Sequence, residues 1–103
     1  MRRRALILAG LLWPAAPALA QRRDHERARA ALEAGEIRPL AEVLTDIERR
    51  FMGRVIEAEL ERDDGQWLYE LKLLPPNGRV YSLEVDARTG EVLSSRGPVQ
   101  HRR

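Results

Sequence analysis

Cysteine is absent from the 103 residues of this chain, and its absence excludes two common features of small exported proteins. No disulfide can stabilise the fold, and no lipid anchor can be attached at a cysteine. The length is that of a single domain. Such a domain must rely on its apolar core alone, and it lies close to the smallest size at which an unstapled fold is stable.

Histidine is also scarce, and the two that occur, His25 and His101, lack the spacing of a metal site. His25 and Glu26 begin like the helical zinc-peptidase motif, but Arg29 occupies the position where a second histidine is required. No serine has a neighbouring histidine, and no phosphate-binding glycine loop is present. The sequence therefore predicts no catalytic, cofactor or metal site, and a protein that is not an enzyme.

Long hydrophobic runs are missing as well. Residues 5–13 are apolar, but this run is shorter than the ~20 residues needed to span a bilayer, and prolines follow it at positions 14 and 17. Three arginines precede the run, and Ala-Leu-Ala at residues 18–20 has the small-x-small pattern of a cleavage site. We therefore predict a signal peptide at residues 1–20, cleavage between Ala20 and Gln21, and a periplasmic or secreted protein with no stable membrane anchor.

Removal of this leader changes the charge balance. The whole chain has 18 basic and 16 acidic residues, and the leader contains three of the arginines and none of the acids. The remaining 83 residues therefore have a formal charge of −1. A basic patch is the electrostatic requirement for binding nucleic acid, so nucleic acid is not an expected partner.

Two helices are expected before residue 53. Residues 21–34 read as a helix, with Asp24 as a candidate N-cap and Gly35 as the stop. Residues 37–51 read as a stronger helix, with Pro39 in the first turn. Its apolar side chains repeat on one face with a helical period: Leu40, Val43, Leu44, Ile47 and Phe51.

Residues 53–95 alternate apolar and polar side chains with a period of two, in four runs separated by glycine-containing turns. The predicted fold is α+β, with one or two N-terminal helices packed on a four-stranded antiparallel β-meander. The alternation places one set of side chains against the helix: Ile56, Ala58, Leu60, Trp67, Tyr69, Leu71, Leu73, Tyr81, Leu83 and Val85. It places Val55, Leu68, Leu74 and Val80 on the opposite, charged face.

This pattern resembles the PepSY domain over residues 40–95, most specifically in the stretch Val-Asp-Ala-Arg-Thr-Gly-Glu-Val at residues 85–92. Other matching residues are Gly53, Val55, Leu60, Gly65, Tyr69, Leu71, Gly78 and Tyr81. PepSY domains occur in propeptides of thermolysin-like metallopeptidases, which they inhibit and help to fold, and in small exported bacterial proteins. The resemblance implies a free-standing exported member. The expected boundaries are an N-terminal helical segment at 21–36, the PepSY-like domain at 37–96 and a flexible tail at 97–103.

The resemblance leaves open which residues bind a partner. The charged face of the predicted sheet is the candidate surface: Glu57, Glu59, Glu61, Glu70, Lys72 and Glu84. Such a face can dock a cationic partner or bind a divalent ion weakly, or it can be the ordinary wet side of an antiparallel sheet. The predicted function is a non-enzymatic binding module that modulates or inhibits an extracytoplasmic peptidase. The alternative is an accessory or sensor protein that binds a signal ligand or the sensor domain of a membrane receptor.

Overall fold

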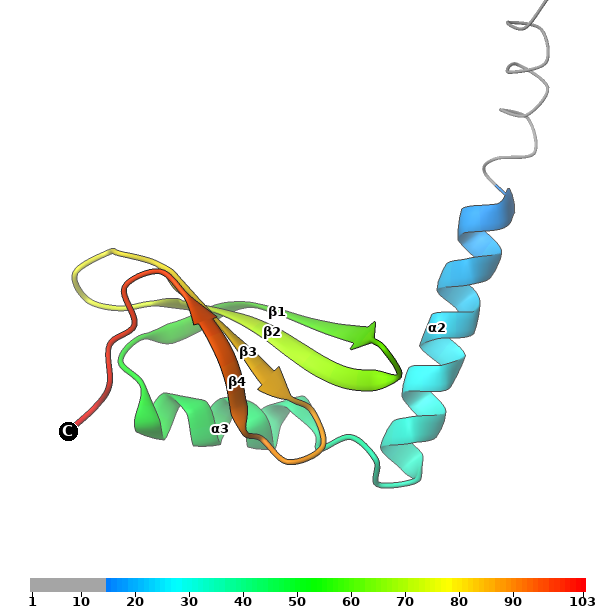
Figure 1. Cartoon of the computed structure of the whole chain (residues 1–103), viewed down its shortest axis with the longest axis horizontal. Helices are drawn as coiled ribbons and strands as arrows, with labels where there is room; N and C mark the ends of the chain where they lie inside the picture. Colours follow the sequence, from blue (N-terminus) through cyan, green and yellow to red (C-terminus); the bar gives the residue numbers. More distant parts are fainter. Residues whose placement is uncertain (1–14) are drawn as a thin grey trace, which may run out of the picture. The chain divides into compact units, whose positions relative to one another are not determined.

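A computed structural model describes residues 15–103, and it has the predicted α+β architecture (Figure 1). The helices are α2 (Ala15–Glu33) and α3 (Leu40–Arg50). The strands are β1 (Arg54–Asp63), β2 (Gln66–Leu74), β3 (Tyr81–Asp86) and β4 (Val92–Arg96). The chain divides into two compact units after Glu33, and the second unit, residues 34–103, contains α3 and the whole sheet.

Helix α2 begins earlier than the sequence suggested. Residues 15–20 are already helical, so Asp24 lies inside the helix and its predicted role as N-cap is wrong. Alanine favours the helical state, and Pro17 is tolerated because it lies in the first turn. The predicted cleavage point falls within α2, whereas positions 1–14 of the predicted signal peptide lie outside the described residues. Within residues 15–103, neither helix is long and apolar enough to cross a membrane.

Helix α3 provides the cover for one face of the sheet (Figure 1). It is shorter than predicted, because Pro39 is the N-cap residue and the chain becomes extended at Phe51. Glu42 in the first turn and the two arginines of the last turn have the charges that favour the helix dipole. Of the apolar stripe, Val43, Ile47 and Phe51 are buried, whereas Leu40 and Leu44 are only partly covered.

The sheet is an antiparallel meander in the order β1-β2-β3-β4. A two-residue turn, Asp64-Gly65, joins β1 to β2, and both residues have positive φ (53° and 77°), as a type I′ hairpin turn requires. The side chains that face α3 form the centre of the core and are 1% exposed or less: Leu71, Leu73, Tyr81, Leu83 and Val85. The core therefore lies between α3 and strands β2 and β3.

The register of β1 corrects the predicted alternation at its start. An irregularity between Val55 and Glu57 places Val55 opposite Leu73, in the core register, whereas Ile56 is 53% exposed. The prediction had these two residues the other way round. The physical reason is a β-bulge, which inserts one extra residue and shifts the alternation behind it. Leu60, also predicted to be buried, is 36% exposed on this edge strand.

Two side chains near the hairpin turn also differ from prediction. Leu68 belongs by register to the charged face, yet it is buried. Trp67, expected in the core, is half-buried, and the Arg62 guanidinium lies 5.3 Å from the centre of its ring. This geometry is a cation–π contact, which is available to an indole that remains close to the surface.

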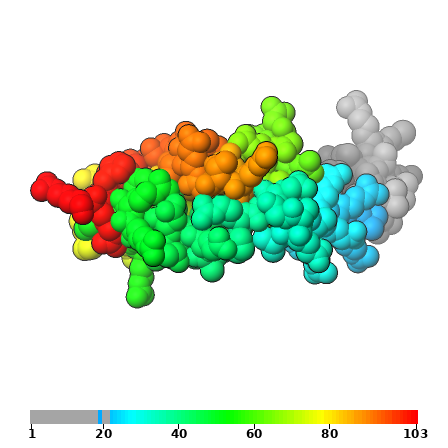
Figure 2. Space-filling model, turned by 90° about the horizontal axis from the view of Figure 1, so that it is seen from below, coloured from blue at the N-terminus to red at the C-terminus, as the bar shows by residue number. Residues whose placement is uncertain are grey.

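The C-terminal segment, predicted as a flexible tail, makes backbone contacts with the end of α3. The amide of Met52 donates to the Gln100 carbonyl (2.8 Å), and the amide of Arg102 donates to the Arg50 carbonyl (2.9 Å). The His101 ring lies 4.9 Å from the ring of Phe51. Figure 2 shows this segment, in red, beside the green end of the helix. The pairing joins residues about fifty positions apart, which local sequence patterns do not reveal.

Candidate protein-binding surface

The strand register places all six predicted site residues on the sheet face opposite α3. Glu59 lies opposite Glu70, and Glu70 lies opposite Glu84, so three glutamates form a row across β1, β2 and β3. The neighbouring row begins with Glu57 opposite Lys72. We call the surface formed by Glu57, Glu59, Glu61, Glu70, Lys72 and Glu84 the acidic face.

The acids of this surface have few compensating partners. Lys72 Nζ lies 3.3 Å from Glu57 Oε2, and within residues 15–103 this is the single ion pair that involves the acidic face. The Ser94 hydroxyl donates a hydrogen bond of 3.4 Å to Glu84 Oε1. Glu70 lies between two like charges in adjacent strands, an arrangement that destabilises a sheet by itself. The net charge of the surface is therefore strongly negative.

The pKa of Glu61 is raised above its ordinary value of 4.5. Desolvation is the largest cause, followed by the negative charge of Glu70 and then of Glu59, Glu84 and Asp63. Every glutamate of the row across the three strands thus contributes to raising the pKa of Glu61. The pKa of this one acid therefore reflects the negative charge gathered on the acidic face.

The structure adds a basic residue, Arg96, that was not among the predicted site residues. Arg96 is the last residue of β4 and lies opposite Ser82, which lies opposite Lys72 in β2. The row from β1 to β4 therefore reads Glu57, Lys72, Ser82 and Arg96. Strict alternation from Val92, which lies opposite the buried Val85, would have placed Arg96 on the helix side, and the register shift between Glu84 and Val85 moves it to the acidic face. Lys72 and Arg96 therefore bring positive charge into the row next to the three glutamates.

In the part of the chain that the structure describes, the acidic face has neither a deep cleft nor a cluster of metal ligands. Its hollow, lined in part by Glu70, Glu84 and Ser94, has a volume of about 60 Å³. Among residues 15–103, no three histidine, aspartate or glutamate side chains are grouped in a way that could hold a metal ion. An open charged surface of this kind can contact a macromolecule of opposite charge.

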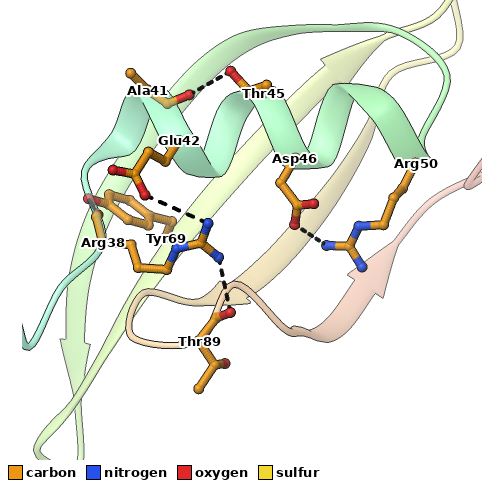
Figure 3. Close-up of polar contacts among 8 residues, drawn as sticks. All are labelled: Arg38, Ala41, Glu42, Thr45, Asp46, Arg50, Tyr69 and Thr89. Atoms are coloured by element: carbon orange, nitrogen blue, oxygen red, sulfur yellow. Dashed lines mark hydrogen bonds and ion pairs between the residues drawn. The ribbon is translucent and has the colours of Figure 1, made fainter.

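The turn between β3 and β4, the most specific part of the predicted motif, is hydrogen-bonded to Arg38, just before α3, and to Arg50 in its last turn. Figure 3 shows the contact of Arg38 with Thr89. The Arg38 guanidinium donates to the Thr89 carbonyl (3.1 Å), and the Arg50 guanidinium donates to the Gly90 carbonyl (3.2 Å). Asp86 Oδ1 accepts from the Arg88 amide at 2.8 Å. The motif at residues 85–92 therefore supports the fold on the helix side and leaves the acidic face free.

This sequence and fold match a known protein family. The sequence model of PepSY, described as "Peptidase propeptide and YPEB domain", matches residues 26–96. No curated protein and no solved structure matches the chain. PepSY domains are modules of the peptidase propeptide or inhibitor type, generally without catalytic activity, and they occur in extracytoplasmic proteins. Since the match covers well over half of the sequence and the two helices precede the expected antiparallel sheet, this chain belongs to the PepSY domain family.

Proposed function

We propose that this protein is an exported, non-enzymatic binding module that modulates or inhibits an extracytoplasmic peptidase. The family supports the peptidase, because PepSY domains are modules of the propeptide and inhibitor type. The leader-like residues 1–20 support export. The partner binds to the acidic face.

The observation that carries this proposal is the glutamate row formed by Glu59, Glu70 and Glu84. Adjacent like charges cost stability, so an exposed row of them suits a surface that gains its counter-charges from a partner. Charge complementarity of this kind speeds association and selects the partner. A peptidase surface rich in lysine or arginine around its substrate cleft is the expected complement.

The test is inhibition kinetics with the purified protein and a purified extracytoplasmic metallopeptidase from the same cell. We expect the protein to slow peptide hydrolysis, and the triple variant Glu59→Gln, Glu70→Gln, Glu84→Gln to weaken this inhibition about tenfold or more. The matched control changes three exposed acids that lie outside the acidic face: Glu33→Gln, Glu36→Gln and Glu91→Gln. This control should inhibit like the unmodified protein.

Salt dependence gives a second readout of the same surface. Inhibition should weaken between about 0.05 M and 0.5 M salt for the unmodified protein, because exposed charges are screened over a shorter distance at high salt. The triple variant should show a smaller salt effect. The absence of inhibition in the unmodified protein would overturn the peptidase assignment, and affinity capture of a membrane receptor in its place would favour the accessory or sensor role.

A further inference from the structure

Strand β1 forms a long open edge of the sheet. Nine of its ten residues pair with β2 on one side, and within residues 15–103 no strand pairs with its other side. The opposite edge strand, β4, has only five residues. Short edge strands are one of the ways in which proteins avoid edge pairing, so β1 is the edge that offers a full-length template.

The hairpin turn determines which backbone groups of β1 face outwards. A two-residue turn makes its flanking pair, Asp63 and Gln66, a hydrogen-bonded pair, and the pairs behind it alternate. Asp63, Glu61, Glu59 and Glu57 therefore direct their amide and carbonyl groups towards β2. Ala58, Leu60 and Arg62 direct theirs towards the open edge. Seven consecutive residues, 57–63, thus present a regular ladder about 20–24 Å long.

The side chains along this ladder alternate between two chemistries. Glu57, Glu59 and Glu61 lie on the acidic face, whereas Ala58 and Leu60 lie on the face that bears the core. Leu60 is 36% exposed, so its apolar surface is available beside the edge. In a new antiparallel ladder the glutamates would occupy non-hydrogen-bonded pairs, in which facing side chains come closest.

We propose that β1 binds an extended segment of a partner protein in which arginine or lysine alternates with apolar residues. The segment adds a fifth strand next to β1, its basic side chains face the glutamates, and its apolar side chains cover Ala58 and Leu60. Main-chain hydrogen bonds supply affinity in this mode, and the alternate side chains supply specificity.

The charge pattern also selects against the most obvious competitor, a second copy of this chain. Pairing β1 with another β1 would bring glutamates of one copy against glutamates of the other, and like charges directly opposite are unfavourable. The bulge before Glu57 ends the regular ladder on that side. The edge therefore resists self-association while it accepts a basic strand.

The first experiment measures binding of labelled seven-residue peptides to the full-length protein by fluorescence anisotropy. The probe peptide has arginine at positions 2, 4 and 6, valine at positions 3 and 5 and threonine at both ends. Its control contains the same residues with the arginines consecutive. We expect the alternating peptide to bind at least about tenfold more tightly, because only its charges match the spacing of alternate strand residues.

The second experiment separates strand pairing from simple charge attraction. Methylation of the two valine amides removes the donors that face Ala58 and Leu60 but leaves the peptide charge unchanged. We expect this peptide to lose at least about tenfold in affinity. Equal binding of the methylated or the consecutive-arginine peptide would overturn the proposal and leave only electrostatic attraction to the acidic face.

A variant of the protein provides the reciprocal test. Ala58→Pro removes an amide that faces the open edge, a position at which edge strands tolerate proline. We expect it to keep its circular dichroism spectrum and to lose peptide binding, whereas the control Ala58→Val keeps both. Should the proline variant unfold, the methylated peptide decides the question with the unmodified protein. None of these measurements involves a peptidase, so peptide binding can fail or succeed independently of inhibition.

Discussion

At the scale of single residues, two tyrosines connect the sheet to the chain on either side of α3. The Tyr69 hydroxyl donates to the Arg38 carbonyl (3.0 Å), just before the helix. The Tyr81 hydroxyl contacts the Met52 carbonyl, just after it, and the Gln100 carbonyl (3.2 Å) in the C-terminal segment. Both rings are buried. Each phenol therefore contributes apolar area to the core and a specific polar contact at one end of the helix.

These tyrosines predict a loss of stability at alkaline pH. Burial raises the pKa of both phenols above the ordinary value of 10.0, although for Tyr81 the hydrogen bond to Gln100 and the charge of Arg102 oppose the effect. Above pH 10 the unfolded chain releases these protons more readily than the folded protein, so the free energy of unfolding falls as pH rises. Urea unfolding monitored between about pH 8 and pH 11 should show this decline.

The variant Tyr81→Phe separates the two contributions of this residue. Its loss of the hydroxyl contacts should lower stability by about 1–2 kcal/mol near neutral pH. It should also make the alkaline decline shallower than in the unmodified protein. An unchanged decline would assign the alkaline effect to other groups.

Gly53 predicts a second single-residue effect. Its φ is +114°, and a Cβ at this position would lie 2.9 Å from the Leu74 carbonyl carbon and from the Pro75 nitrogen, both of which are backbone atoms. Gly65 has a φ of +77°, but a Cβ there would meet nothing within 4 Å. We therefore expect Gly53→Ala to cost clearly more than Gly65→Ala, with about 1 kcal/mol for strain alone in the control. Equal melting temperatures of the two variants would contradict this close approach.

At the scale of elements, α3 is held by a few side chains rather than by its whole apolar stripe. Ile47 is fully buried, whereas Thr45 is exposed and donates only to the Ala41 carbonyl within the helix. Ile47→Ala should lower the free energy of unfolding by about 2–4 kcal/mol, because it removes buried methyl groups and leaves a cavity. Thr45→Ala should change it by less than about 0.5 kcal/mol. Chemical denaturation of both variants tests whether α3 packs against the sheet through Ile47.

The elements themselves could be predicted because their signals are local. Turn residues such as Asp64 and Gly65, and the period-two alternation behind them, are sufficient to define the strands and the acidic face. The bulge was not predictable, because Val55 and Ile56 are both apolar β-branched residues and either could face the core. The contact of Phe51 with His101 was missed because it depends on chain segments distant in sequence.

The candidate site was predictable to a different extent. Side-chain parity placed its six residues on one face, since alternation alone determines the face once the strands are known. Which acids lie opposite one another depends on register, and register is set here by the hairpin turn and by bulges. The row of Glu59, Glu70 and Glu84 is therefore a property of the folded sheet and not of any one strand.

At the scale of the whole molecule, negative charge is gathered on the acidic face, and it contributes to the pH dependence of stability through Glu61. The folded protein holds a proton on Glu61 more tightly than the unfolded chain does, because the pKa of Glu61 is raised by desolvation and by Glu70 and its neighbours. Stability contributed by this group therefore increases as pH falls through the raised pKa towards 4.5 and is lost again as pH rises. Stability near neutral pH is thus lowered by the surface proposed for binding.

Glu70→Gln tests this link between charge and stability. Glu70 lies between Glu59 and Glu84, so its neutralisation removes two unfavourable cross-strand pairs. At about pH 7 and low salt, the variant should be more stable than the unmodified protein by roughly 0.3–1 kcal/mol, and the gain should shrink in 1 M salt. The control Glu91→Gln changes an exposed acid outside the acidic face and should have little effect.

The same variant should also act on its neighbour. Because the charge of Glu70 is the largest electrostatic cause of the raised pKa of Glu61, Glu70→Gln should move that pKa back towards 4.5, as measured by NMR titration of the Glu61 carboxyl carbon. A basic partner bound to the acidic face should lower this pKa in the unmodified protein as well, since positive charge favours the ionised carboxylate. An unchanged Glu61 titration in Glu70→Gln would mean that the glutamates are too well solvated to interact with one another. That result would contradict the electrostatic argument for the acidic face as a binding surface.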